Sequence, residues 1–256
     1  MELGKAEIQE AQGGAPHELG FDPDKLIGGI ETHEADARAE NPEAALHDPE
    51  QLAAPVEGLE QTQQGFEQLD NGNTRYDHPQ ETGTVLNSNQ GEAVKGFVQD
   101  CGLVSAENVC KLAGKDISEA DVIAVARKNK DCDDHVLFHA EDNGGATSDQ
   151  ICDVLSHLGV NAEVKGALPI NEVAGAVESG RGVIACVDVS KFWESWPFPG
   201  GHAVTLTSVE RNPAGDVVAF YVCDSGTGGE DACRRVEADR LSNSLRETLI
   251  TEKPIW

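Results

Sequence analysis

The chain has 256 residues and a formal net charge of −27, from 46 acidic against 19 basic side chains. This balance argues against nucleic acid or an anionic membrane as a partner, because proteins that bind either present clustered Lys and Arg. No apolar run approaches the roughly 20 residues of a membrane-spanning helix, and the opening residues lack the basic and apolar regions of a Sec signal. We expect synthesis in the cytoplasm and no membrane insertion.

The acidic character is strongest at the start of the chain. Residues 1–90 hold 19 acidic and 4 basic side chains and no cysteine. They are rich in Glu, Ala, Gln and Pro, so they offer little apolar surface to offset the entropy cost of ordering. Residues 55–69 are compatible with a short amphipathic helix, and residues 70–84 are typical of turns and loops. We interpret residues 1–90 as a largely irregular acidic leader, either disordered or partner-binding.

Helical patterns follow from about residue 92. The spacing of apolar residues predicts a first helix that begins at or just after Cys101 and ends at Gly114. Ser118 is a suitable N-cap for a second helix, and Thr147 or Ser148 for a third. Residues 170–180 form a fourth, shorter helical pattern.

Strand patterns occupy the rest of the chain. Residues 182–190, 202–210 and 216–225 are alternating or wholly apolar, and the turn at 211–215 joins the last two in a hairpin. A helix over 236–245 and a closing strand over 246–253 complete the pattern. Helices first and antiparallel strands second indicate an α+β fold, with residues 91–256 as one domain.

The seven cysteines all follow residue 90. Their number is odd, and several lie within apolar runs or helical patterns. This distribution favours reduced, mostly buried thiols over a disulfide framework.

Three residues have positions that suit nucleophilic catalysis. Cys101 lies at a predicted helix N-terminus, where backbone N–H groups and the helix dipole favour a thiolate. His202 opens one strand of the hairpin, and Asp224 ends the other. A hairpin centred on Pro213 and Ala214 brings these two together, and a thiol, an imidazole and a carboxylate are the groups needed for acyl transfer through a thioester.

These residues lie in motifs that resemble a known family. The stretches QDCGLVSAENVCKLAG, NGGATSDQICDVLSHLG, GGHAVTLTSV and FYVCDSGTG are similar to papain-like cysteine peptidases of the C39 type, the double-glycine leader peptidases of bacteriocin exporters and their stand-alone relatives. The resemblance covers about residues 95–250. It implies a papain-like fold with the active site between a helical half and a sheet half, with Cys101 as nucleophile, His202 as general base and Asp224 as the orienting acid.

The resemblance departs from the family at the oxyanion donor. The family usually has a Gln six residues before the cysteine, and that position here is Lys95. Gln99 stands two residues before Cys101 and Gln90 eleven before. Gln99 is our choice of donor; if neither Gln reaches the site, the Cys101 N–H must do more of the stabilisation.

The resemblance also implies a biological setting. Exporter peptidases are fused to membrane transporters, and no such segment is present in this sequence. A free-standing C39-like domain behind an acidic leader is more similar to bacterial effector toxins, which a specialised secretion system delivers into a target cell. Such toxins are neutralised at home by an immunity protein. The leader would then serve delivery or bind a secretion or adaptor partner.

Simpler interpretations stand beside these. Cys101 is otherwise an inert helix-start thiol, His202 a solvent-facing strand residue and Asp224 a turn residue. Cys132, His135 and His139 have a spacing compatible with a metal site, but no fourth ligand is obvious, so we expect a polar loop and no metal or cofactor. The residues Trp193, Trp196, Pro197 and Phe198 are either a hydrophobic plug or the wall of a substrate pocket.

The sequence therefore favours a cysteine endopeptidase that acts on a protein substrate. Two alternatives remain open. Transglutaminase, deamidase or acyltransferase chemistry also proceeds through a Cys thioester. A catalytically inactive papain-like binding module is the other, and the displaced Gln is its main support.

Overall fold

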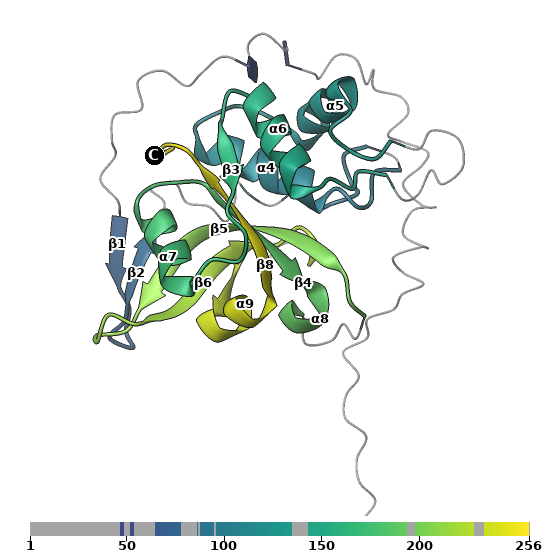
Figure 1. Ribbon diagram of the computed structural model, residues 1–256. Coiled ribbons are helices and arrows are strands. Elements are labelled where there is room, and N and C mark those ends of the chain that lie inside the picture. The colour runs from purple at the N-terminus through teal and green to yellow at the C-terminus, as the bar shows by residue number, and fades with distance from the viewer. Residues whose placement is uncertain are drawn as a thin grey trace, which may run out of the picture. The chain divides into compact units, whose positions relative to one another are not determined.

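The computed structural model describes residues 47–48, 52–53, 65–77, 86, 88–94, 96–134, 143–193, 198–227 and 233–255. The chain divides into two units between Ala45 and Leu46, and all the described elements belong to the second unit. Figure 1 shows that a twisted sheet in this unit separates two groups of helices. None of the helices described is long and apolar enough to cross a membrane.

The first group of helices comprises α4 (Cys101–Leu112), α5 (Glu119–Asn129) and α6 (Ser148–His157). Capping boxes fix the starts of α5 and α6: Ser118 exchanges hydrogen bonds with Asp121, and Thr147 with Gln150. Gly114 follows α4 at a φ of +80°, a conformation that favours glycine. The predicted helix starts and caps are therefore confirmed.

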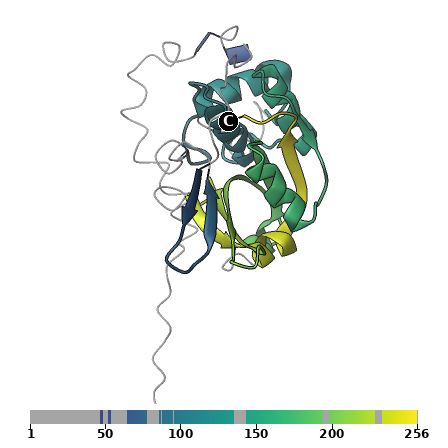
Figure 2. The ribbon, with the colours of Figure 1, turned by 90° about the vertical axis from the view of Figure 1, so that its left-hand side faces the viewer.

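The sheet has eight strands, and every strand pairing described is antiparallel. The strands are β1 (Gly65–Gln68), β2 (Thr74–Asp77), β3 (Ala162–Val164), β4 (Val183–Asp188), β5 (Gly201–Arg211), β6 (Val217–Cys223), β7 (Cys233–Glu237) and β8 (Leu245–Thr251). β5, the longest, pairs with β4 along its first half, with β2 along its second half, and with β6. The view in Figure 2 shows the β1–β2 hairpin at one side of the sheet.

The second group of helices covers the opposite face of the sheet. It comprises α7 (Ile170–Glu178), α8 (Val189–Phe192) and α9 (Ala238–Ser244). The side chains of each strand contribute alternately to two hydrophobic cores, because successive side chains of a strand point to opposite faces of the sheet. Ile184 and Leu249 pack with the first group of helices, whereas Val204 and Leu206 pack with the second.

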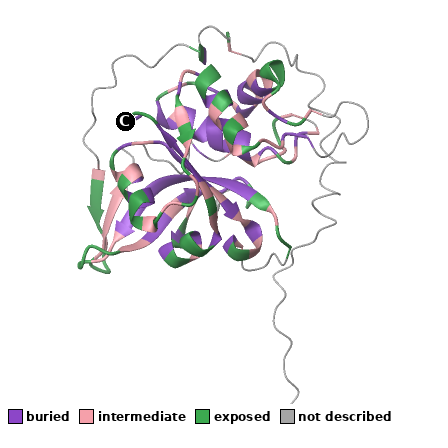
Figure 3. Cartoon of the chain, viewed as in Figure 1, coloured by how far each residue is buried: buried purple, intermediate pink, exposed green. Residues whose placement is uncertain are grey.

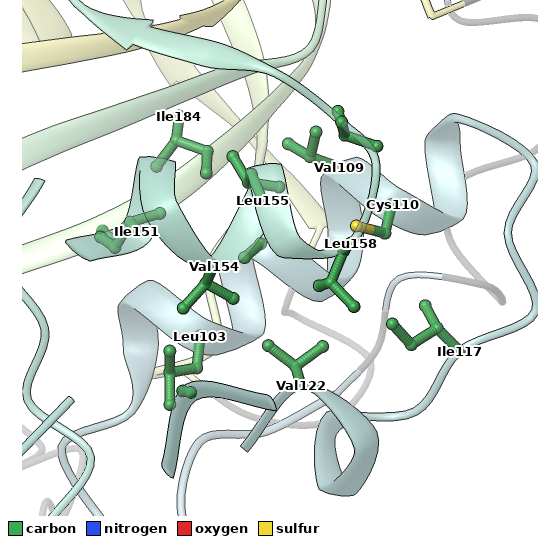
Figure 4. Close-up of a cluster of buried hydrophobic side chains, with 14 of the residues drawn as sticks. Leu103, Val109, Cys110, Ile117, Val122, Ile151, Val154, Leu155, Leu158 and Ile184 are labelled. Atoms are coloured by element: carbon green, nitrogen blue, oxygen red, sulfur yellow. The ribbon is translucent and has the colours of Figure 1, made fainter. Parts of the chain in front are cut away.

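The larger core lies between α4, α5, α6 and the sheet (Figure 4). Leu103, Val154 and Leu155 are at most 1% exposed there. Figure 3 shows buried residues concentrated along the central strands and on the sides of the helices that face them. The predicted α+β class, with a helical half packed on an antiparallel sheet, is confirmed.

The structure places part of the predicted leader inside this domain. β1 and β2 were expected in a helix and a loop, but β2 pairs with residues 208–211 of β5. Leu52 and Leu86 are buried in the larger core, and Lys115 donates a hydrogen bond to the Leu52 carbonyl. The boundary between units thus lies near residue 46 and not at residue 90, because pairing with the sheet stabilises strands that composition alone does not predict.

Cysteine pairing also differs from the sequence-based expectation for one pair. Cys223 and Cys233 face each other across β6 and β7, with 4.1 Å between their Cα atoms, and are joined by a disulfide. The other five cysteines have free thiols, as expected: Cys101, Cys110, Cys132, Cys152 and Cys186. This pair was not predicted because the short strand that carries Cys233 has no clear strand pattern in the sequence.

The position of the domain boundary can be tested by truncation. A chain that starts at residue 91 loses β1, β2, Leu52 and Leu86, and it exposes the edge of β5, so we expect it to melt at a lower temperature than the full chain and to aggregate. A chain that starts at residue 46 keeps these contacts and should melt like the full chain. Circular dichroism at 222 nm and light scattering measure both. Equal melting temperatures for the two truncated chains would place the boundary at residue 90 after all.

Candidate active site

Cys101 is the first residue of α4, as predicted. Asp100 is the N-cap, but its side chain makes no capping hydrogen bond; one of its oxygens accepts from the Gly91 N–H instead, at 3.0 Å. The first turn of α4 carries no acidic residue either. The Asp100 side chain therefore leaves the first N–H groups of α4 uncapped and available to an oxyanion, whereas its charge raises the pKa of the neighbouring Cys101 thiol.

His202 and Asp224 meet at the end of the hairpin. Thr205 on β5 pairs with Cys223 on β6, and Asp224 directly follows β6. His202 Nε2 lies 2.7 Å from Asp224 Oδ1, and both side chains are almost fully buried. The predicted proximity of these two residues is confirmed, with the register differing by one residue from a turn centred on Pro213 and Ala214.

The Asp224 carboxylate accepts hydrogen bonds from three further donors. Trp193 Nε1 lies 2.9 Å and an Arg234 terminal nitrogen 3.1 Å from Oδ2, and the Gly226 N–H lies 3.1 Å from Oδ1. The Trp193 ring also packs against the imidazole at a tilt of 49°, with 4.8 Å between the ring centroids. Any residue larger than glycine at position 226 would bring its Cβ within 2.7 Å of the Trp193 ring. Asp224 is therefore fixed from several sides.

The three residues form an electrostatically coupled chain. Burial raises the pKa of the Cys101 thiol, but the hydrogen bond and charge of His202 and the Ala203 N–H outweigh it, so the net pKa is lowered. Burial likewise lowers the pKa of His202, yet its partners Asp224 and Cys101 raise it to about 9. Burial opposes ionisation of Asp224 too, but its hydrogen bonds lower its pKa to about 2. The lowered pKa of Cys101 and the raised pKa of His202 both act in the direction of a thiolate–imidazolium pair.

A cleft of about 870 Å³ lies in front of this chain of residues. Cys101 and His202 line it, and so do Trp193 and Phe198. These two aromatic residues therefore line a cleft, as the pocket-wall interpretation requires, whereas Trp196 and Pro197 lie outside the described residues. The cleft is large enough to hold several residues of an extended peptide, and the thiol at its wall is partly exposed.

Both candidate glutamines line the same cleft. Gln90 is held by its surroundings: its backbone N–H donates to the Ser225 carbonyl at 3.2 Å, its Nε2 donates to the Val98 carbonyl at 3.1 Å, and its Oε1 accepts from the Ser225 hydroxyl at 3.4 Å. Gln99 donates its backbone N–H to the Asn143 carbonyl at 3.1 Å. The structure thus places both near the thiol and gives Gln90 a fixed amide orientation.

Three buried carboxyl groups hold the segment that carries Gln90. The Gly91 N–H donates to Asp100 and the Ser88 hydroxyl donates to Glu107 at 3.1 Å, while the backbone at Ala93 acts on the Glu119 carboxyl and lowers its pKa. Lys111 forms an ion pair with Glu107 at 2.7 Å. Burial and the adjacent Asp100 raise the pKa of Glu119 to about 9. Glu119 is therefore neutral at pH 7, which avoids repulsion between two adjacent buried carboxylates.

The described part of the structure shows no metal site that includes Cys132, whose spacing to His135 and His139 is compatible with one. Cys132 is buried, and His135 and His139 lie outside the described residues. Elsewhere in the described ranges, no group of three or more His, Cys, Asp or Glu side chains has the arrangement of a metal site.

The sequence patterns did not identify several residues of the site. Arg234 lies on β7, a strand that had no visible pattern, and the roles of Gly226 and Ser225 depend on a turn whose path only the fold determines. Trp193 was identified as a possible pocket wall but not as a hydrogen-bond donor to Asp224. A tryptophan shortly before the histidine strand was the only available signal.

Comparisons with known proteins give structural likenesses only. No family model matches the sequence, and no curated protein matches it. A protein described as a C39-like peptidase from Bacillus anthracis is similar over 66% of this chain and 94% of its own, with 13% identity and a TM-score of 0.47. A double glycine motif protease from an AMS/PCAT transporter, solved with its leader peptide, is similar over 60% and 84%, with 13% identity and a TM-score of 0.39.

A third solved structure, UfSP from C. elegans, is similar over 76% of this chain and 35% of its own length, with 14% identity and a TM-score of 0.41. At such identities and TM-scores, function has to be inferred from the side chains of the site itself.

The raised pKa of Glu119 predicts a pH-dependent stability. A carboxyl with a folded-state pKa of about 9 and an unfolded pKa near its ordinary value of about 4.3 binds a proton on folding, so the free energy of unfolding falls as pH rises between these values. We expect Glu119→Gln to gain stability relative to wild type as the pH rises from 5 to 9. Urea unfolding at several pH values measures this, with exposed Glu172→Gln as control. A constant difference between the Glu119→Gln and wild-type stabilities would show that Glu119 titrates normally.

Proposed function

We propose that this protein is a papain-like cysteine endopeptidase that cleaves a protein substrate. The observations that carry the proposal are the 2.7 Å hydrogen bond between His202 and Asp224 and the position of His202 and Cys101 on the wall of one peptide-sized cleft, where His202 lowers the pKa of the thiol. A nucleophile, a base and an orienting carboxylate in contact are the arrangement that activates a thiol for acyl transfer.

In the proposed reaction the Cys101 thiolate attacks the scissile carbonyl carbon. The His202 imidazolium then gives its proton to the leaving amine, and the peptide C–N bond breaks to leave a thioester on Cys101. His202, now neutral, takes a proton from water, and the resulting hydroxide breaks the thioester and releases the acid product. Asp224 stays ionised throughout and accepts the Nε2–H bond, which leaves Nδ1 facing the sulfur.

The negative charge on the substrate oxygen needs donors. The Cys101 N–H at the start of α4 is one, and a glutamine amide in the cleft is the second. Gln99 is the donor that the sequence suggests, but the bonds that fix Gln90 favour Gln90. An amide held in place before the reaction stabilises a developing charge without reorganisation.

The two glutamines can be separated by matched substitutions. We expect Gln90→Ala to lower kcat by about 10²- to 10³-fold with little change in KM, because an oxyanion donor acts in the transition state. Gln99→Ala should lower it by less than tenfold. Steady-state kinetics on one cleaved peptide measure both, and circular dichroism confirms folding. The opposite order of effects would make Gln99 the donor.

The setting in which the enzyme acts belongs to the same proposal. We infer a bacterial effector toxin, made in the cytoplasm, delivered to a target cell by a specialised secretion system and neutralised in the producing cell by an immunity protein. Support comes from the resemblance of the Cys101, His202 and Asp224 motifs to free-standing C39-like domains and from the acidic residues that precede the domain. Those residues are the proposed contact of a secretion or adaptor partner.

One experiment tests both the chemistry and the toxicity. Expression of the full chain in bacteria without an immunity protein should stop growth and create new protein N-termini, and Cys101→Ala should abolish both effects while the fold is retained. Cys152→Ala removes another free thiol, outside the cleft, and should behave like wild type.

A Cys101-dependent one-unit mass gain without cleavage would indicate deamidation, and a new amide bond would indicate transamidation. If Cys101→Ala were as active as wild type, the proposed nucleophile would be wrong; if wild type caused no change at all, the protein would be a binding module.

A further inference from the structure

One carboxylate lines the cleft that holds the proposed nucleophile and has no cationic partner among the residues that the structure describes. Glu247 on β8 lines the cleft and is half-buried. Its one polar contact in the described ranges is the Ser148 hydroxyl at the start of α6, which donates to Oε2. Within this part of the chain, no ion pair compensates the negative charge of Glu247.

The strand register fixes how far this charge lies from the thiol. Glu247 pairs with Cys186 on β4, and Cys186 pairs with Ala203 on β5. The Ala203 N–H acts on the Cys101 thiol and lowers its pKa, and both residues line the cleft. Neighbouring strands are about 4.8 Å apart, so Glu247 lies two strand spacings, roughly 10 Å, from the position where the sulfur sits. An extended peptide advances about 3.4 Å per residue, so this distance suits a long side chain one or two residues from the scissile bond.

The other charges at this end of the cleft cancel. Arg246 precedes Glu247 and also lines the cleft, but its guanidinium lies 2.8 Å from the Asp188 carboxylate. The register shifts between Cys186 and Val187, so that Val187 pairs with Leu245 and Arg246 is the extra residue of a β-bulge. The bulge places two consecutive charged residues, Arg246 and Glu247, at the cleft. Of these two, only Arg246 has its charge neutralised, by Asp188. The net charge presented to a ligand is that of Glu247.

We propose that Glu247 forms a subsite that selects a Lys or Arg side chain within two residues of the scissile bond. This inference deepens the proposed peptidase function and depends on it for the meaning of the scissile bond. The subsite lies between β8 and the start of α6, with Ser148 holding the carboxylate in place and Cys186 at its floor. A basic side chain is the one substrate group that would pair with this charge in a partly buried site, where an unpaired carboxylate is costly.

A purely structural role for Glu247 makes a different prediction. A carboxylate at the N-terminus of α6 stabilises that helix through its dipole, and the Ser148 hydrogen bond would serve the same purpose. The structural role therefore predicts that Glu247→Gln lowers stability, whereas the subsite makes no such prediction. Only the subsite predicts that the charge of an incoming molecule matters for reaction at Cys101, so charge selectivity is the measurement that separates them.

The test uses the rate of alkylation of Cys101 in the full chain, measured by mass spectrometry of its peptide. The probes are neutral iodoacetamide, cationic (2-bromoethyl)trimethylammonium and anionic iodoacetate. We expect Glu247→Gln to lower the ratio of the cationic to the neutral rate by roughly two- to tenfold, as expected for a charge about 10 Å away, and high salt to reduce the difference. Glu247→Lys should invert the preference towards iodoacetate.

Two control variants match these changes. Glu163→Gln removes one negative charge from β3, outside the cleft, where Glu163 pairs with Lys165, and should leave the ratio as in wild type. Ser148→Ala removes the hydrogen bond but keeps the Glu247 charge, so the cationic preference should persist even if stability falls. An unchanged ratio in Glu247→Gln, or an equal change in Glu163→Gln, would overturn the subsite.

Cleavage of a mixed peptide library completes the test. We expect wild type to enrich cut sites with Lys or Arg within two residues of the broken bond, and Glu247→Gln to lose this enrichment while still cutting. Identical cut-site preferences in both proteins would overturn the subsite even though the peptidase function stands. A Glu247-dependent alkylation ratio with no cleavage of any peptide would support the subsite for a cationic ligand and reject the peptidase.

Discussion

The site depends on one buried negative charge. The Asp224 carboxylate is fully buried, and a carboxylate without partners in such a place would take up a proton and lose its effect on the imidazole. Four donors from four parts of the chain prevent this: His202 on β5, Trp193 after α8, Arg234 on β7 and the Gly226 N–H in the turn after β6. These hydrogen bonds keep the carboxylate ionised, and they also fix the positions of the four donor groups.

A second set of buried carboxyl groups holds the segment that carries Gln90 to the cleft. Asp100 turns away from the helix it would normally cap and binds the chain at Gly91, while Glu107 and Glu119 hold neighbouring residues of the same segment. As a result the start of α4 is left open and Gln90 is fixed beside it. The direction of the Asp100 side chain thus affects both the helix start that carries the Cys101 thiol and the position of Gln90. Buried acidic residues here support the site instead of simply adding to the charge of −27.

Local signals in the sequence predicted a large part of this arrangement. The helix starts at Cys101, Ser118 and Thr147 follow from caps and apolar spacing, and the hairpin brought His202 to Asp224 because its turn residues are distinctive. β1, β2 and β7 escaped prediction because short strands gain their stability from pairing with distant segments. For the same reason Arg234 and the disulfide between Cys223 and Cys233 had no signal, and the true domain start near residue 46 was missed.

The two walls of the cleft therefore have different origins. Residues that bond to one another through the hairpin lie near in sequence, so their proximity can be inferred before the fold is known. The other wall joins α4, α6, β4 and β8, which are up to 146 residues apart between Cys101 and Glu247. Only the folding of the whole sheet brings them together. It follows that the contact between His202 and Asp224 is easier to infer from sequence than their meeting with Cys101 or the selectivity of the cleft, because the first depends on one hairpin and the others on packing between distant elements.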